Sequence, residues 1–225
     1  ADAVTWYENR GSGTFSSPQS ITTAVDGPVS VQTADVDGDG DLDVIVGSLL
    51  DAQLLWYVTE GDGTFGPARL FADSVRGLET LHITDLDNDD VPDVLAVSYR
   101  DSVIYRFEPQ HSEADSVRFT TGPALPDLQS GPIDVNTADV TGNGWEDVLI
   151  GLDGSPSVFV VENQTDTTGT LTFGDRQVLT SEVKTVEGID TGDVDGDGSP
   201  DLVAGSFDSE AIVWFRNEGN GAFTA

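Results

Sequence analysis

Short segments rich in aspartate and glycine occur four times in the chain of 225 residues. The first runs Asp35-Val36-Asp37-Gly38-Asp39-Gly40-Asp41-Leu42-Asp43, with carboxylates at positions 1, 3, 5 and 9 and glycine at position 6. Calcium takes about six to eight oxygen ligands, and alternate residues of a tightly coiled loop can direct their oxygens at one centre. This pattern of residue types therefore predicts a calcium site in the loop.

Every loop can be aligned on the same ligand positions. We expect side-chain oxygens at positions 1, 3, 5 and 9, and a backbone carbonyl at position 7. The predicted metal ligands are Asp35, Asp37, Asp39, Asp41 and Asp43 in the first loop, Asp85, Asp87, Asp89, Val91 and Asp93 in the second, Asp139, Thr141, Asn143, Trp145 and Asp147 in the third, and Asp193, Asp195, Asp197, Ser199 and Asp201 in the fourth. Ligation by oxygen alone favours calcium over zinc, and over magnesium, which keeps its waters. The sequence thus predicts up to four bound Ca²⁺ ions.

The four loops fit this pattern unequally. The second has Asp90 at position 6, where aspartate tolerates the left-handed backbone at a modest cost. The third has Thr141 and Asn143 in place of carboxylates. Because calcium affinity falls with ligand charge, we expect the site around Asp139 to be the weakest. A soluble Asp-Gly turn is the alternative, but it does not explain four loops with one spacing, whose crowded carboxylates would repel one another without a cation.

The loops belong to a repeat that covers the whole chain. Their first aspartates follow one another at intervals of 50, 54 and 54 residues: Asp35, Asp85, Asp139 and Asp193. A second element follows each loop, and a further copy of it opens the chain, so that residues 1–17 align with residues 209–225. Self-similarity at about 50 residues is typical of repeat architectures.

Each unit is predicted to contain four short strands. In the first complete unit these are Val29–Ala34, Leu42–Val46, Leu54–Val58 and Thr64–Phe71, which are rich in β-branched and apolar residues. No segment shows a sustained helical period, so helices should be nearly absent. An all-β fold with four strands in about 50 residues predicts the blade of a β-propeller, and an open solenoid of β-meanders is the alternative. The polar insertion Glu108–Ser116 is expected to be a surface loop.

The expected organisation is a single β-propeller region over residues 1–225, with about four to five blades. The predicted parts are 1–26 as the outer hairpin of a first blade, 27–76, 77–130 and 131–184 as complete blades, and 185–225 as most of a last blade. The chain starts at the third strand of one unit and stops in the fourth strand of another. Either one copy is displaced or the chain is a segment of a larger ring, which we favour.

The Asp/Gly loops, together with elements such as TWYENRGSGTF at residues 5–15, resemble the FG-GAP/VCBS repeat superfamily. This superfamily includes the blades of integrin-α-type propellers and of many secreted microbial proteins. The resemblance implies a loop between the first two strands of a blade that holds calcium through positions 1, 3, 5 and 9 and the carbonyl at position 7. The first and fourth loops match this pattern fully, whereas Asp90 and the third loop depart from it.

Composition excludes several classes of partner. Asp and Glu number 41 against 9 Lys and Arg, a net charge of −32. Such a field repels nucleic acid and anionic lipid. No apolar run is long enough to insert into a membrane. The absence of cysteine removes disulfides and thiolate metal sites.

We expect the protein not to be an enzyme. It has two histidines, of which His82 is predicted to lie in a core strand, and the loops account for most of the carboxylates. Among the aromatic residues, one repeat position holds Trp6, Trp56 and Trp214, with Tyr105 and Val160 in the other copies, and recurrence there indicates packing between blades. Trp145, an indole inside a polar loop, is instead a candidate ligand contact.

The expected function is therefore that of a calcium-stabilised module, secreted or at the cell surface, with a structural, adhesive or recognition role. Its partner would be a protein or glycan at an extracellular surface, or further copies of itself. Two alternatives remain open. One is a carbohydrate-binding lectin that uses pockets between blades or Trp145, and the other is the propeller portion of a polysaccharide-degrading enzyme.

Overall fold

A computed structural model describes residues 2–111, 117–123, 125, 128, 131–154, 156–180 and 183–224. Its strands are β1 (Val4–Trp6), β2 (Gln19–Thr22), β3 (Pro28–Ala34), β4 (Asp43–Ser48), β5 (Gln53–Tyr57), β6 (Arg69–Ala72), β7 (Leu78–Thr84), β8 (Asp93–Ser98), β9 (Val103–His111), β10 (Val117–Thr121), β11 (Pro132–Ala138), β12 (Asp147–Leu152), β13 (Val158–Asn163), β14 (Phe173–Thr180), β15 (Val186–Gly192), β16 (Asp201–Ser206), β17 (Ala211–Asn217) and β18 (Phe223–Thr224). These ranges contain no helix, which confirms the predicted all-β class. Accordingly, no helix that could cross a membrane is found in the part of the chain described.

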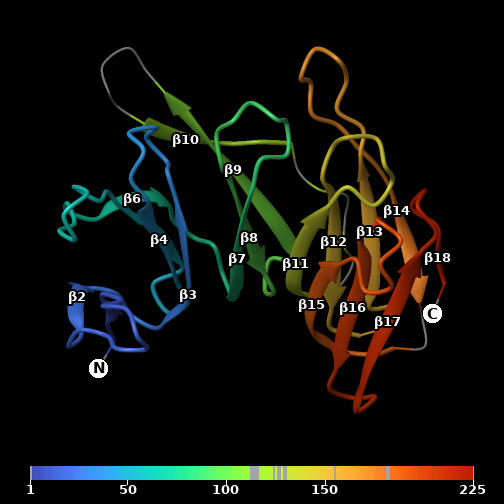
Figure 1. The fold of residues 1–225 in the computed structure, drawn as a ribbon, viewed down its shortest axis with the longest axis horizontal. Coiled ribbons are helices and arrows are strands. Elements are labelled where there is room, and N and C mark those ends of the chain that lie inside the picture. The colour runs from blue at the N-terminus through green and yellow to red at the C-terminus, as the bar shows by residue number, and fades with distance from the viewer. Residues whose placement is uncertain are drawn as a thin grey trace.

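The strands form four antiparallel sheets of four strands, preceded by the two-stranded hairpin β1–β2. Each sheet consists of strands that are consecutive in the sequence: β3–β6, β7–β10, β11–β14 and β15–β18. The sheets follow one another across the molecule in chain order, and the two termini lie at opposite sides (Figure 1). One sequence repeat therefore corresponds to one sheet.

Apolar clusters fill the spaces between consecutive sheets. Between the first two sheets, for example, Ile45 and Trp56 pack with Leu81 and Ala96. The second strands of the first three sheets, β4, β8 and β12, are buried at every residue. This burial explains their continuous apolar sequence, because a strand covered on both faces has no need to alternate with polar residues.

The first strands of neighbouring sheets lie side by side. The side chain of Gln32 on β3 donates a hydrogen bond from Nε2 to the carbonyl of Leu81 on β7, at 2.9 Å. Further along, the backbone N–H of Ile189 on β15 donates to Asp134 Oδ2 on β11, at 2.8 Å. Each Asp/Gly loop connects the first strand of a sheet to the second, and so the four loops follow one another along the row of first strands.

Two predicted segments differ from the structure. The fourth strand of the first unit, expected at Thr64–Phe71, is reduced to an isolated bridge between Thr59 and Phe65 followed by β6. Pro67 lies between these two parts and has no N–H for a sheet hydrogen bond. In the expected surface loop Glu108–Ser116, residues 108–111 instead extend β9 and pair with β10. Residues 112–116, and the predicted unit bounds at 1, 130 and 225, lie outside the described residues.

Candidate metal centres

The aspartate at position 1 organises each loop. In the first loop Asp35 Oδ1 accepts hydrogen bonds from the N–H groups of Gly38 (2.8 Å) and Asp39 (3.1 Å). Its Oδ2 accepts from Gly40 N–H at 3.0 Å. Asp139 and Asp193 receive equivalent bonds from their own loops. The loops therefore share one coiled backbone, which explains why their aspartates recur at fixed positions.

This coil requires left-handed residues at positions 4 and 6. In the first loop these are Gly38 and Gly40, with φ of 77° and 93°. In the second loop they are Asn88 and Asp90, with φ of 50° and 66°. Asp90 thus adopts the left-handed conformation that the sequence predicted for it, at a strain that glycine would not incur.

Three loops bring carboxylates together at positions 1, 3 and 5. In each of them the three side chains have ligand oxygens within 4.8 Å of one another: Asp35, Asp37 and Asp39; Asp85, Asp87 and Asp89; and Asp193, Asp195 and Asp197. Groups of this kind could hold a metal ion. The third loop contributes no such triad among the described residues, since Asp139 is followed by Thr141 and Asn143.

The aspartate at position 9 has a different environment. Asp43, Asp93, Asp147 and Asp201 each begin the second strand of a sheet and are completely buried. Asp43 accepts hydrogen bonds from Thr59 N–H and Trp56 Nε1, both at 2.8 Å. Asp201 accepts from Asn217 N–H at 2.8 Å. None of the triads found in the described residues includes this aspartate, which ties its loop to the third strand.

The first loop contains a polar atom without a partner. The Oδ1 atom of Asp37 is buried and makes no hydrogen bond, and the equivalent Oδ1 atom of Asp87 in the second loop is also buried without one. Burial, and then the charge of Asp39, raise the pKa of the Asp37 carboxyl. An unpaired buried carboxylate oxygen is costly unless a cation or donor satisfies it. The residues of the first loop therefore fit a hard cation held between positions 1, 3 and 5.

A positively charged side chain from β9 contacts the second loop. Arg106 lies on β9 opposite Leu95 on β8, and its Nη2 atom is 2.6 Å from Asp87 Oδ2 and 2.9 Å from Asp93 Oδ1. Burial raises the pKa of Asp93 to about 7, and the charge of Arg106 opposes that rise. Burial also disfavours the charged guanidinium, but Asp93 and then Asp87 outweigh it and raise the pKa of Arg106. The guanidinium consequently remains positively charged.

The alignment of the repeats by residue type predicts Tyr105 at the position of Trp56. The structure shows that this prediction is wrong by one residue, because Arg106 occupies the position. The sheet pairs Ile45 with Trp56 and Leu95 with Arg106. The same position holds Val160 on β13 and Trp214 on β17. Trp56 is buried between sheets, whereas Trp214 on the last sheet is 41% exposed.

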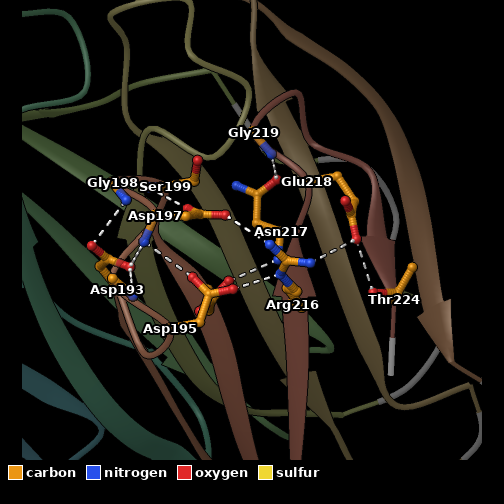
Figure 2. A network of polar contacts seen from close by, with 12 residues as sticks. Asp193, Asp195, Asp197, Gly198, Ser199, Arg216, Asn217, Glu218, Gly219 and Thr224 are labelled. Atoms are coloured by element: carbon orange, nitrogen blue, oxygen red, sulfur yellow. Dashed lines mark hydrogen bonds and ion pairs between the residues drawn. The ribbon is translucent and has the colours of Figure 1, made fainter.

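The fourth loop also meets an arginine, but at the surface. Figure 2 shows Arg216 on β17 directed at the loop, with Nε 2.6 Å from Asp195 Oδ2 and Nη2 3.2 Å from Asp197 Oδ2. The Arg216 side chain is 43% exposed, so it can turn into solvent. Backbone hydrogen bonding from Ser199, and then Arg216, lower the pKa of Asp197.

The third loop is completed by neutral groups. Thr141 N–H donates to Asp147 Oδ2 at 3.0 Å, and the Asn143 side chain donates from Nδ2 to the carbonyl of Asn163 at 2.9 Å. Trp145 is half-buried, and its backbone N–H donates to Asn143 Oδ1 at 2.8 Å. Its role as a ligand contact stays a prediction, as do the ligand roles of the position 7 carbonyls, Asp41, Val91, Trp145 and Ser199.

Two buried asparagines at the end of the third strand were not recognised from the sequence. Asn163 donates from Nδ2 to the carbonyls of Leu86 (2.7 Å) and Glu146 (3.1 Å), which belong to the second and third loops. Asn217 likewise bonds the carbonyls of Val140 and Pro200, in the third and fourth loops. Each asparagine thus connects successive loops. The available signal was the recurrence of Asn9, Asn163 and Asn217 three residues after Trp6, Val160 and Trp214. One carbonyl partner of each buried asparagine, however, lies 77 residues away.

Comparison with known proteins places these features in a family. The profile of the FG-GAP-like repeat matches residues 1–46, 85–150 and 139–204, which confirms the resemblance seen in the sequence. No curated protein matches the chain.

Two solved structures are similar over almost the whole chain. One is the Photorhabdus luminescens Tc holotoxin pore, with 15% identity and a TM-score of 0.45 over 98% of this chain. The other is the V. cholerae biofilm matrix protein Bap1, with 20% identity and a TM-score of 0.45 over 99% of this chain. The chain spans only 10% and 34% of the lengths of these two chains.

Proposed function

Because the chain belongs to the FG-GAP-like repeat family, we propose that it is a calcium-binding module of a secreted or cell-surface protein. In this proposal its sheets are blades of a β-propeller, and its role is structural, adhesive or recognitional, not enzymatic. Its partner is a protein or glycan at that surface, or another copy of the chain.

The arrangement of the sheets supports the propeller. Four consecutive four-stranded sheets pack face to face, and their first strands lie in a row. Radial repetition of such sheets around an axis is the architecture of a propeller. An open solenoid would also stack its units, but four strands per repeat of about 50 residues is the propeller's proportion.

The observation that carries the calcium proposal is an unsatisfied oxygen in the first loop, whose triad carboxylates form no ion pair among the described residues. Asp37 Oδ1 is buried without a partner inside a triad of carboxylates whose ligand oxygens lie within 4.8 Å of one another. In the fourth loop, Asp193, Asp195 and Asp197 form an equivalent triad, from which the exposed Arg216 can withdraw. Bound calcium would offset most of the negative charge of these carboxylates and cross-link positions 1, 3 and 5 of the loop. The chain itself contributes the aspartate at position 1, which holds the loop in its coil, and the buried aspartate at position 9, which anchors the end of the loop.

The proposed location follows from calcium supply. Calcium-binding extracellular modules have dissociation constants of roughly 10⁻⁴ to 10⁻³ M, which requires millimolar calcium. A net charge of −32 is also compatible with an exposed module that must remain soluble. The structural roles of the carboxylates support a non-enzymatic function. The aspartates at position 1, for example, accept hydrogen bonds from backbone N–H groups of their own loops.

Equilibrium dialysis against calcium tests the proposal. Substituting Asp37→Asn removes a triad carboxylate, and we expect the number of bound ions to fall by one. Asp2→Asn, at an exposed position outside the loops, removes the same charge and should leave the number unchanged. If Asp37→Asn binds as many ions as the wild type, with the same affinity, the first loop is not a calcium site and the proposal fails.

A further inference from the structure

The second sheet differs from the other three at one position of its third strand. Arg106 occupies the place that Trp56, Val160 and Trp214 hold in the other sheets. The guanidinium does not extend into solvent, since the Arg106 side chain is only 3% exposed. A buried arginine therefore replaces an apolar residue beside one of the four loops.

The guanidinium bridges the carboxylates of this loop. Its Nη2 atom contacts Asp87 Oδ2 at position 3 (2.6 Å) and Asp93 Oδ1 at position 9 (2.9 Å). The other oxygen of Asp87, Oδ1, is buried without a hydrogen bond, as is Asp37 Oδ1. The Asp87 carboxylate nevertheless has the guanidinium as its counter-charge, whereas no ion pair to Asp37 is found in the part of the chain described. Its Nη1 atom lies 3.2 Å from Glu108 Oε2 on the same strand. Three carboxylates thus surround one fixed positive charge. A planar cation with several donors is well suited to such multiple pairing.

The surrounding backbone leaves room for this side chain. A Cβ atom at Gly122, which follows β10, would lie 2.7 Å from Arg106 Nη1 and 3.0 Å from its Cδ. Gly122 N–H also donates to the Arg106 carbonyl at 3.1 Å. Glycine at this position therefore permits the backbone to pass against the arginine.

We infer that Arg106 takes the place of a metal ion in the second loop, so that this loop is held closed without calcium. The inference rests on the proposed function, since it separates the second loop from the two other loops with carboxylate triads, which use calcium. A dication between positions 1, 3 and 5 would lie beside the buried guanidinium, and the two like charges would repel each other.

The fourth loop provides the contrast within the same chain. Arg216 contacts Asp195 and Asp197 but is 43% exposed, so a cation can displace it into water. The buried Arg106 side chain cannot turn into solvent in this way. Separating it from its carboxylates would leave the guanidinium charge buried without a partner. Of the three loops with a carboxylate triad, the second is thus the one that does not take calcium.

The test compares calcium binding in the wild type and Arg106→Gln by equilibrium dialysis of the full chain. Removing the guanidinium should add one bound calcium ion to the wild-type number. Adding Asp87→Asn to Arg106→Gln should abolish this gain. Arg118→Gln, which removes the same charge from an exposed position on β10, should bind the wild-type number. Equal binding by the wild type and a folded Arg106→Gln would overturn the inference.

Single substitutions in the wild-type background give an answer that does not depend on whether Arg106→Gln folds. Asp87→Asn should leave the number of bound ions unchanged, whereas Asp37→Asn should lower it by one. Loss of an ion in Asp87→Asn would show that the second loop binds calcium and would refute the role of Arg106. Failure of Asp37→Asn to lose an ion contradicts the proposed function instead, so the two failures are distinguishable.

Discussion

Removal of calcium with a chelator at neutral pH should lower the melting temperature of this protein by about 6–12 °C. A site at about ten times its dissociation constant contributes about 1.4 kcal/mol. The first and fourth loops together then contribute about 3 kcal/mol, and a domain of this size loses about 2–4 °C per kcal/mol. Thermal unfolding followed by circular dichroism, with and without a millimolar excess of calcium, measures the shift.

The same experiment at about pH 5 should give a smaller shift. In the absence of a cation, burial raises the pKa of Asp43, and burial with the charge of Asp39 raises that of Asp37. A carboxyl whose pKa is raised by folding stabilises the fold at low pH and loses that contribution as the pH rises through the folded-state pKa. Acid therefore stabilises the cation-free form relative to neutral pH.

Magnesium in place of calcium is the control for ionic strength and should protect less.

A melting temperature that is the same in calcium and in chelator at neutral pH would contradict this prediction. So would equal protection by magnesium, since a general effect of divalent salt on a chain of charge −32 would then suffice.

Substituting Asn163→Ala should destabilise the fold by about 2–4 kcal/mol, because a buried acceptor left without a donor costs about 1–3 kcal/mol. Asn163 is completely buried and donates to the carbonyls of Leu86 and Glu146. Its Oδ1 also accepts hydrogen bonds from the N–H and the hydroxyl of Thr165. The loss removes the connection between the second and third loops and should appear in urea unfolding as a lower midpoint.

Gln164→Ala is the matched control for Asn163→Ala. Gln164 is the next residue, is exposed, and bonds only Glu162 through its side-chain amide at 3.0 Å among the contacts described. Its truncation should change stability by less than about 0.5 kcal/mol, as is usual at exposed sites. Equal unfolding midpoints for the two variants would show that Asn163 does not connect the loops.

The loops and the class of fold could be predicted from the sequence because both depend on local patterns. The coil of the first loop follows from Asp35 at position 1 and glycine at positions 4 and 6, all within a few residues. Short runs of β-branched residues between such loops are similarly sufficient to indicate strands. The fourth strand of the first unit was overextended because Gly66 and Pro67 interrupt the pairing that Thr64 and Phe65 begin.

The role of Arg106 depends on strand register, which an alignment by residue type assigned wrongly. Tyr105 is the aromatic residue of that strand, and aligning it with Trp56 was natural by residue type. A shift of one residue moves a side chain to the opposite face of the sheet, so this alignment directed the arginine away from the loop. The pairing of β8 with β9 places Arg106 against Asp87 and Asp93. The spacing agrees, since Arg106 follows Asp85 by 21 residues, as Trp56 follows Asp35.

The position 9 aspartates and the asparagines depend on contacts that no local pattern contains. The ligand role of Asp43 stays a prediction, and the structure adds that its oxygens accept hydrogen bonds from Trp56 on the third strand and from Thr59 beyond it. Asn217 reaches Val140 in the preceding repeat. Both arrangements arise from packing between strands and sheets, and spacing along the chain does not reveal them.

Anomalous scattering from crystals grown with calcium tests the central claim most directly. We predict a difference peak in the first loop contacted by Asp35, Asp37 and Asp39, a second in the loop of Asp193, and none beside Arg106. A first loop without a peak at millimolar calcium, with the Asp37 carboxylate turned to solvent, would contradict the account.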